Sequence, residues 1–268
     1  MGSRQVSAAG ANGISIAYRD SGTSGQPLVL INGFASTMDM WSPPFLAALA
    51  RSFRTIVFDN RGTGYTPADA TLFSIPRFAA DTAALMDALG IPRAHVLGLS
   101  MGASVAQEFS LAYPGRVDRL ILVSGTCGGN EAVGIPAEIW SRLTDKSGSP
   151  ADLAARMFSL LFPEDWLAAR DPWQYCPSVT ETTSEENAAR QAEAFFSWPG
   201  SYDRLPEIRC PVLVVTGAED RIIPPENSRI LAGRIPGARL AVIPGAGHGL
   251  QYQCPGVFAR IVAGFLQA

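Results

Sequence analysis

Residues 95–103 read HVLGLSMGA, and this short stretch decides the fold that the sequence encodes. Its first residues form a continuous apolar run typical of a buried strand, and the residues from Met101 onward have the apolar spacing of a helix. The pattern G-x-S-x-G, from Gly98 to Gly102, lies across the junction of the two. A serine at such a strand-to-helix turn is held exposed, so we predict that Ser100 is a nucleophile.

The two glycines around Ser100 have a steric explanation. A serine on a sharp, strained turn leaves no room for a side chain two residues before it or two residues after it. The helix that begins at Met101 then directs free backbone N–H groups, and the positive end of its dipole, toward the reaction zone. A hydroxyl group alone is a weak nucleophile, so a base must lie nearby.

Outward from this stretch, short apolar runs recur along the chain, and most are separated by a segment with helical spacing. Because the runs are continuous rather than alternating, they predict strands that are buried on both faces. This repetition predicts an α/β fold with a mostly parallel central sheet flanked by helices. The predicted strands are residues 27–31, 55–58, 94–97, 120–123, 211–216 and 240–243, the predicted helices are 41–51, 75–89, 101–113, 225–234 and 256–266, and Asn12-Gly13 predicts a hairpin turn.

The alternation of strands and helices is interrupted between about residues 128 and 205, where only amphipathic helical segments occur. Residues 1–127 and 206–268 are therefore predicted to form the α/β core domain, and residues 128–205 a helical cap. Four of the five tryptophans fall in the cap, so we expect it to cover a cavity. The alternative is that these rings form the small core of the cap itself. The predicted pocket residues are Trp41, Trp140, Phe158, Trp166, Phe196 and Trp198.

The charge pattern excludes several classes of partner. The chain has 21 basic and 24 acidic residues, a net charge of −3 and a single lysine, Lys146. A nucleic-acid surface or a polybasic membrane anchor is therefore not expected. No apolar run approaches the roughly 18 residues that a spanning helix needs, so no membrane span is predicted. The N-terminal residues lack the apolar region of a secretory signal, which favours a cytoplasmic location.

The four cysteines lie far apart and lack the spacing of a metal site. Buried free thiols are the expected state, and no metal or other cofactor is predicted. The positions are Cys127, Cys176, Cys210 and Cys254.

Only two histidines can supply the base. His95 precedes Ser100 by five residues on the same predicted strand, about 16 Å away, so we expect it to be structural. His248 lies in the glycine-rich stretch PGAGHG, which follows the predicted strand at 240–243. That places His248 at the carboxyl edge of the sheet, as for Ser100, where open parallel sheets hold their active sites. We therefore predict that His248 is the base.

A carboxylate is needed to fix the tautomer of His248 and to stabilise its charged form. Asp220 qualifies, because it closes the loop GAED after the predicted strand at 211–216. The neighbouring Glu219 and the more distant Glu131 are the alternatives, and both are more typical of solvated positions.

The order Ser, Asp, His at these loops is that of the α/β-hydrolase fold. From about residue 27 to the end, the chain resembles the α/β-hydrolase superfamily of esterases, lipases and carbon–carbon hydrolases. The resemblance rests on five motifs in order: INGF at 31–34, DNRGTG at 59–64, the serine turn, GAED at 217–220 and GAGH at 245–248. These motifs indicate the fold more specifically than the substrate.

The resemblance implies an oxyanion hole built from two backbone N–H groups, those of Phe34 and Met101. Many members have histidine where this chain has Asn32, but neither N–H group depends on that side chain. A second departure is Thr66, where serine is common, in a segment that we interpret as structural turn chemistry.

The expected activity is hydrolysis of a small apolar acyl compound: a carboxylic ester, lactone or thioester, cleaved through an acyl-enzyme without a cofactor. A serine nucleophile argues against the dehalogenase and epoxide hydrolase branches, which use aspartate. Carbon–carbon bond hydrolysis and cofactor-free haloperoxidase or perhydrolase activity stay open, since they use the same triad. The alternative from another functional class is a small-molecule receptor that keeps the triad and uses it for sensing. Self-association into a homo-oligomer also stays open.

Overall fold

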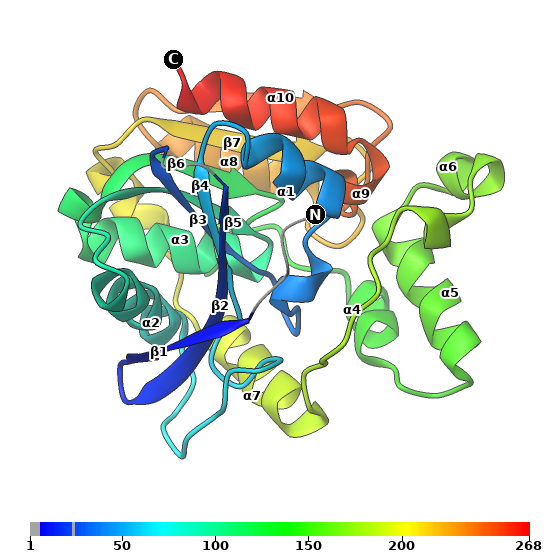
Figure 1. Ribbon diagram of the computed structural model, residues 1–268. Coiled ribbons are helices and arrows are strands. Elements are labelled where there is room, and N and C mark those ends of the chain that lie inside the picture. The colour runs from blue at the N-terminus through cyan, green and yellow to red at the C-terminus, as the bar shows by residue number, and fades with distance from the viewer. Residues whose placement is uncertain (1–5, 23–24) are drawn as a thin grey trace.

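The computed structural model describes residues 6–22 and 25–268, and at its centre lies an eight-stranded sheet (Figure 1). The strand order is β1-β2-β4-β3-β5-β6-β7-β8. The strands from β4 to β8 in that order are parallel, whereas β2 pairs antiparallel with both β1 and β4. The strands are β1 (Ser7–Ala11), β2 (Ile14–Gly22), β3 (Pro27–Ile31), β4 (Arg54–Phe58), β5 (Ala94–Leu99), β6 (Val117–Val123), β7 (Val212–Gly217) and β8 (Arg239–Ile243).

Helices cover both faces of the sheet, which explains why its central strands are apolar without interruption. On β5, Val96 packs into one core with helices α2, α3 and α8, and the next residue, Leu97, packs into the other core with α1 and α10. Figure 1 shows α2 and α3 on one side and α1 and α10 on the other. The helices are α1 (Pro43–Leu49), α2 (Ile75–Ala88), α3 (Met101–Ala112), α8 (Pro225–Arg234), α9 (Leu250–Gln253) and α10 (Pro255–Leu266).

The predicted mostly parallel sheet with flanking helices is confirmed, and so is the hairpin at Asn12 and Gly13 between β1 and β2. The main difference lies in the first helix, predicted over residues 41–51. Trp41 has an extended backbone, and α1 begins only at Pro43. Proline is well suited to the first turn of a helix because its missing N–H would have no helical partner there.

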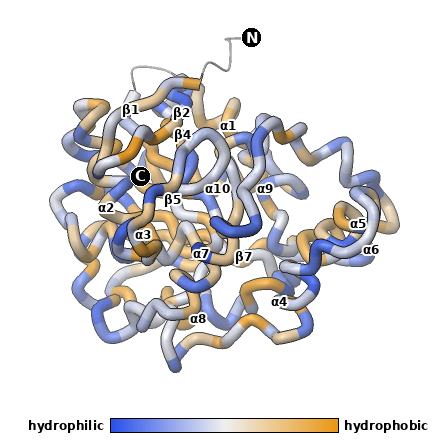
Figure 2. Tube along the Cα trace, turned by 90° about the horizontal axis from the view of Figure 1, so that it is seen from below, coloured by the Kyte–Doolittle hydropathy of each residue, from blue (hydrophilic) through white to orange (hydrophobic). Residues whose placement is uncertain are grey.

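Between β6 and β7 the chain forms helices and no strand. These are α4 (Ala137–Thr144), α5 (Pro150–Leu161), α6 (Glu164–Ala169) and α7 (Glu185–Phe196). Helices α4, α5 and α6 stand to one side of the sheet in two perpendicular views, and α5 mixes apolar and polar residues (Figures 1 and 2). Helix α7 lies apart from them, against the core (Figure 1). The domain limits at residues 128 and 205 stay a prediction.

The turn segment 59–64 is held by its own polar groups. Asp59 is buried and accepts a hydrogen bond from the backbone N–H of Tyr65 at 2.9 Å. A Cβ atom at Gly64 would lie 2.4 Å from Asp59 Oδ2, and Gly64 has a φ of +49°. The hydroxyl of Thr66 accepts a hydrogen bond from the backbone N–H of Ala17 in β2. These contacts are those of a structural turn.

Two further expectations concern thiols and membranes. All four cysteines are free, but only Cys127 is fully buried, and the other three are half-buried. Burial raises the pKa of the Cys127 thiol to about 11.

Within residues 6–22 and 25–268, no helix is long and apolar enough to cross a membrane.

His95 is enclosed in the core on β5. Its side chain meets the ring of Phe53 edge-on, with 5.9 Å between ring centroids, and its residue is 2% exposed. Neither ring nitrogen has a hydrogen-bond partner among the residues that the structure describes. Burial therefore lowers the pKa of His95, and the nearby Arg119 and Arg93 act in the same direction, whereas Asp118 opposes them.

This environment predicts a pH-dependent contribution to stability. Because the folded state disfavours protonation of His95, its contribution is complete above the unfolded pKa of about 6.5 and is lost as the pH falls toward the lower folded pKa. Urea unfolding at pH 7.5 and pH 5.5 is expected to show a larger loss of unfolding free energy for the wild type than for His95→Leu. Equal losses in the two proteins would contradict this prediction.

Candidate active site

Ser100 occupies a strained position between β5 and α3. Its φ is +58° and its ψ is −122°, a backbone conformation that residues other than glycine rarely adopt. The backbone N–H of Ser100 donates to the carbonyl of Val123 on the neighbouring strand at 2.8 Å. The turn is therefore held by the sheet itself, and the Ser100 side chain stays partly exposed.

The steric role predicted for the two glycines is confirmed. A Cβ atom at Gly98 would lie 2.2 Å from the carbonyl oxygen of Gly102. A Cβ atom at Gly102 would lie 2.2 Å from the carbonyl oxygen of Ile31 on β3. Real Cβ atoms do not approach backbone so closely, so both positions require glycine.

His248 and Asp220 are in direct contact. Nδ1 of His248 lies 2.8 Å from Oδ2 of Asp220, and the two side chains are 10% and 0% exposed. The other carboxylate oxygen accepts hydrogen bonds from the backbone N–H groups of Ile222 at 3.0 Å and Ile223 at 2.9 Å. The carboxylate thus has fixed partners on both oxygens. When Nδ1 donates to Asp220, Nε2 of His248 is left as the proton acceptor.

The register of the sheet explains why Ser100, Asp220 and His248 share one edge. Leu99 pairs with Val123, and Val123 pairs with Val215. Ser100, Asp220 and His248 follow the carboxyl ends of β5, β7 and β8, and parallel strands end on the same side.

The alternative carboxylates, Glu219 and Glu131, are both exposed. The carboxylate that the structure brings to His248 is that of Asp220.

Phe34 and Met101 lie at positions suited to donate hydrogen bonds to an oxyanion. Met101 is the first residue of α3, so its N–H has no carbonyl partner within the helix. Phe34 follows Gly33, where a Cβ atom would lie 3.1 Å from Cβ of Ser100. The Asn32 side chain donates to the carbonyl of Thr37, so it is used within the loop.

The predicted pocket aromatics separate into two groups. Trp140 lies against Phe34, with ring centroids 5.4 Å apart, and Phe196 meets Trp140 at 4.6 Å. These two rings are therefore next to the loop that carries a candidate oxyanion donor. Phe158 and Trp166 instead pack on Phe162, as expected if those rings form the core of their own segment.

The structure places the remaining two predicted pocket residues in the core. Trp41 is 1% exposed, precedes α1 on an extended backbone and stacks on Phe45 of that helix. Trp198 is 5% exposed, and its indole N–H donates to Glu108 at 2.7 Å. Sequence spacing does not distinguish a ring that faces a cavity from one that fills the core.

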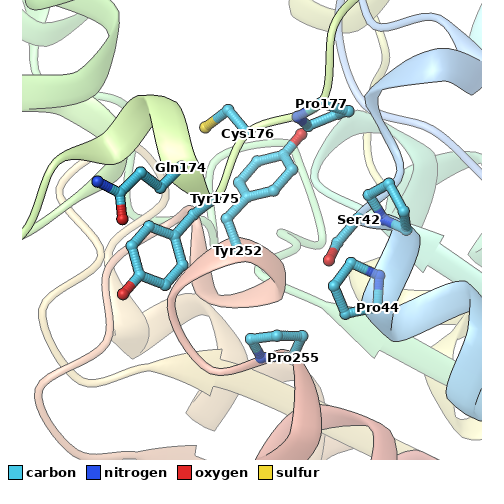
Figure 3. A pocket seen from close by; sticks show the side chains of 9 residues that line it. Ser42, Pro44, Gln174, Tyr175, Cys176, Pro177, Tyr252 and Pro255 are labelled. Carbon is cyan, nitrogen blue, oxygen red and sulfur yellow. The ribbon is translucent and has the colours of Figure 1, made fainter.

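A cavity of about 180 Å³ lies elsewhere, and none of the predicted pocket residues lines it (Figure 3). Its walls are Ser42–Pro44, residues 174–177, Tyr252 and Pro255. In Figure 3 the Tyr252 ring stands between Tyr175 and the Ser42–Pro44 segment. The Tyr252 hydroxyl donates to the carbonyl of Met40, and burial raises the pKa of this phenol well above its ordinary value. Because three separate segments form the cavity, no local pattern predicts it.

The chain belongs to the alpha/beta hydrolase family, whose model matches residues 28–261. This match spans the strands β3 to β8 and all three candidate catalytic residues. The fold and the serine turn thus define the protein as an α/β-hydrolase.

The chain is similar in sequence and in structure to several hydrolases. A Caulobacter sp. (strain K31) protein named "Putative carbamate hydrolase RutD" is 31% identical over 245 residues, 90% of each chain. Among solved structures, a hydrolase from Pseudomonas aeruginosa PA01 is 30% identical, with a TM-score of 0.82 over 98% of this chain and 99% of that one. The enol-lactonase from Burkholderia xenovorans LB400 is 26% identical, with a TM-score of 0.83 over 98% of this chain and all of the other, 100%. A thermophilic esterase from Thermogutta terrifontis is 28% identical, with a TM-score of 0.80 over 98% of each.

Proposed function

We propose that the protein is a serine hydrolase that cleaves a carboxylic ester or lactone through an acyl-enzyme. The observation that carries this proposal is the 2.8 Å contact between His248 Nδ1 and the buried Asp220, at the same sheet edge as the strained Ser100. Asp220 holds His248 in the tautomer whose Nε2 accepts a proton, and this is the requirement for activating a serine hydroxyl.

The reaction begins when Ser100 Oγ attacks the substrate carbonyl and its proton passes to His248. The N–H groups of Phe34 and Met101 stabilise the negative charge that develops on the carbonyl oxygen. The protonated His248 then gives its proton to the leaving group, and an acyl-enzyme forms. Water, activated by the same histidine, attacks the acyl carbonyl and releases the acid and Ser100.

The acyl group of the substrate is proposed to be apolar. Trp140 and Phe196 form an aromatic surface beside Phe34, and Phe196 is 54% exposed. Such rings favour an alkyl or aromatic group over a sugar or a phosphate compound. Two of the similar structures are an enol-lactonase and an esterase, which supports the same substrate class. Residues 128–205 are proposed to act as a cap over this surface.

Carbamate hydrolysis is the second candidate. Several relatives at 28–31% identity bear the name "Putative carbamate hydrolase RutD". The same serine attack applies to a carbamate carbonyl, so the catalytic residues do not separate the two functions. The aromatic surface beside Phe34 favours the ester, because a small carbamate leaves that surface unused.

A matched substrate panel tests this proposal. The panel contains p-nitrophenyl esters from acetate to decanoate, a γ-lactone series and p-nitrophenyl N-butylcarbamate, which matches the hexanoate ester in length. We expect the highest kcat/KM with medium-chain esters, because each buried methylene contributes about 0.8 kcal/mol of binding.

Each other outcome of the panel excludes part of the proposal. Fastest cleavage of acetate would contradict the apolar acyl site, and turnover of the carbamate alone would favour the second candidate. No turnover of any compound, with a fluorophosphonate still labelling Ser100, would exclude ester hydrolysis. The function would then be carbon–carbon hydrolysis, peroxide chemistry or ligand sensing.

A further inference from the structure

The residue after Phe34 has an unusual backbone. Ala35 has a φ of +51°, in the left-handed region that favours glycine. A residue other than glycine keeps this conformation only when its surroundings hold it there. The loop from Gly33 to Ser36 is closed by a hydrogen bond of 3.3 Å from the N–H of Ser36 to the carbonyl of Gly33.

Both polar groups of Ala35 are bound by one distant segment of the chain. Its N–H donates to Oε1 of Gln191 on α7 at 2.9 Å, and its carbonyl accepts from the hydroxyl of Thr183 at 3.0 Å. Gln191 is 156 residues away along the chain and Thr183 is 148 residues away. The two side chains thus hold Ala35 from both sides.

Gln191 is poorly explained as a residue for stability alone. It is 0% exposed, and its Nε2 has no hydrogen-bond partner in residues 6–22 and 25–268. A buried donor without an acceptor is unfavourable, and an apolar side chain of the same size avoids that cost. The hydrogen bond that the Gln191 side chain does make is the one in which Oε1 accepts from the Ala35 N–H.

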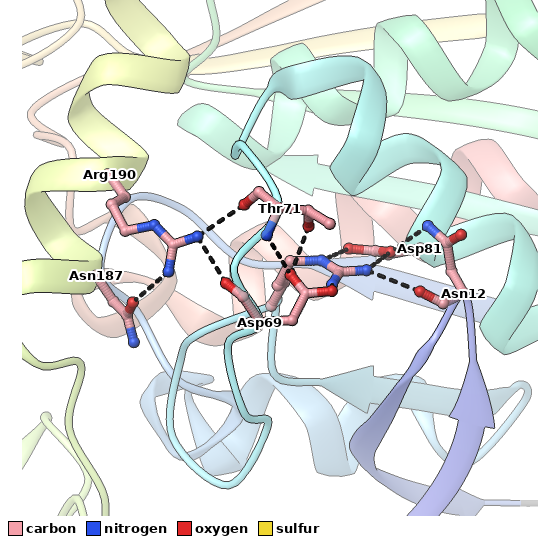
Figure 4. A network of polar contacts seen from close by, with 7 residues as sticks. Asn12, Asp69, Thr71, Asp81, Asn187 and Arg190 are labelled. Carbon is pink, nitrogen blue, oxygen red and sulfur yellow. Dashed lines mark hydrogen bonds and ion pairs between the residues drawn. The ribbon is translucent and has the colours of Figure 1, made fainter.

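The helix that carries Gln191 is itself anchored to the core (Figure 4). The preceding residue, Arg190, donates to the carbonyls of Asp69 at 2.8 Å and Thr71 at 2.7 Å. The Asp69 carboxylate pairs at 2.7 Å with the fully buried Arg61, which also pairs at 2.7 Å with Asp81. Oε1 of Gln191, which accepts from the Ala35 N–H, therefore lies on a helix that hydrogen bonds and ion pairs hold in place.

We propose that Gln191 and Thr183 are positioning residues that orient the Phe34 N–H for the oxyanion. The inference rests on the proposed function, because it assigns Phe34 to the oxyanion hole. Gln191 fixes the peptide between Phe34 and Ala35, and Thr183 fixes the peptide between Ala35 and Ser36, so together the two side chains limit rotation of the turn that carries Phe34. The group proposed to stabilise the transition state thus depends on α7, which belongs to the helical segment between β6 and β7.

Matched variants test this proposal. Gln191→Met removes the acceptor at nearly constant side-chain size. Thr183→Val removes the hydroxyl, and Thr183→Ser retains it. Glu193→Gln, at an exposed position of α7, is the control. We expect kcat for the best ester to fall about 10- to 100-fold in Gln191→Met and Thr183→Val, because a small misplacement of a catalytic group has effects of this size. KM and Tm of these two variants should change little, and Thr183→Ser should keep most of the wild-type activity.

The affinity for a transition-state analogue distinguishes positioning of the oxyanion donor from a purely structural role, because a structural role alone would leave this affinity unchanged. A trifluoromethyl ketone forms a tetrahedral adduct with the serine, and its oxygen occupies the oxyanion hole. Its Ki should rise by the same factor as kcat/KM falls, whereas the affinity for the carboxylic acid product should stay within twofold. Wild-type kcat in both Gln191→Met and Thr183→Val, or a lower kcat with an unchanged Ki, would overturn the proposal. Activity that survives Ser100→Ala would refute the proposed function, and the positioning role with it.

Discussion

Ser100→Ala is expected to lower kcat for the best p-nitrophenyl ester by about 10⁴- to 10⁶-fold. The variant has no group to form the acyl-enzyme, and only the oxyanion donors and the binding surface then contribute to the rate. The fold should be unchanged. Alanine has the same steric difficulty as serine at a φ of +58°, and the hydrogen bond from the residue 100 N–H to Val123 involves only backbone.

The measurement compares initial rates of the two proteins, prepared in parallel, with circular dichroism and Tm to verify the fold. A fluorophosphonate should label the wild type and not the variant. If the variant keeps more than about one hundredth of the wild-type rate, and the label does not appear on any contaminating hydrolase, the serine mechanism is wrong.

Asp220→Asn is expected to lower kcat by about 10⁴-fold, the second largest effect. The amide oxygen can still accept from the N–H groups of Ile222 and Ile223, so the loop should keep its conformation. The amide NH₂ group then faces Nδ1 of His248 and donates to it, which favours the tautomer with the proton on Nε2. A histidine in that tautomer cannot accept the proton of Ser100.

Glu219→Gln is the matched control, because Glu219 is adjacent in sequence but exposed. It should retain at least half of the wild-type kcat, and both variants should unfold near the wild-type temperature. A similar loss in both variants would show that charge in this loop matters more than the contact with His248. A kcat for Asp220→Asn within tenfold of the wild type would remove Asp220 from the proposed triad.

Much of the candidate site could be predicted because its determinants are local. Gly98 and Gly102 are required by contacts within one turn and the adjacent strand, and G-x-S-x-G records that requirement directly. Asp220 and His248 follow apolar runs that end at the same edge of a parallel sheet, so their proximity follows from the topology.

The pocket aromatics could not be predicted individually. Trp41 and Trp140 are both large apolar residues near helix starts, yet one stacks beneath α1 and the other stands beside Phe34. Trp41 lies on the extended backbone before α1, whereas Trp140 lies within α4. The apolar pattern shows that a ring is buried, and it does not show which neighbour buries it.

By itself, the sequence determined the α/β-hydrolase fold and the strained turn at Ser100, because glycine sterics and apolar periodicity act over a few residues. It also predicted the roles of Ser100, Asp220 and His248. Only the tertiary structure decided which rings stand beside Phe34, where the cavity of about 180 Å³ lies, and that Gln191 and Thr183 bind Ala35. Those contacts join residues up to 156 positions apart, and their geometry is set by how α7 packs on the core. No pattern of neighbouring residues encodes such a distance.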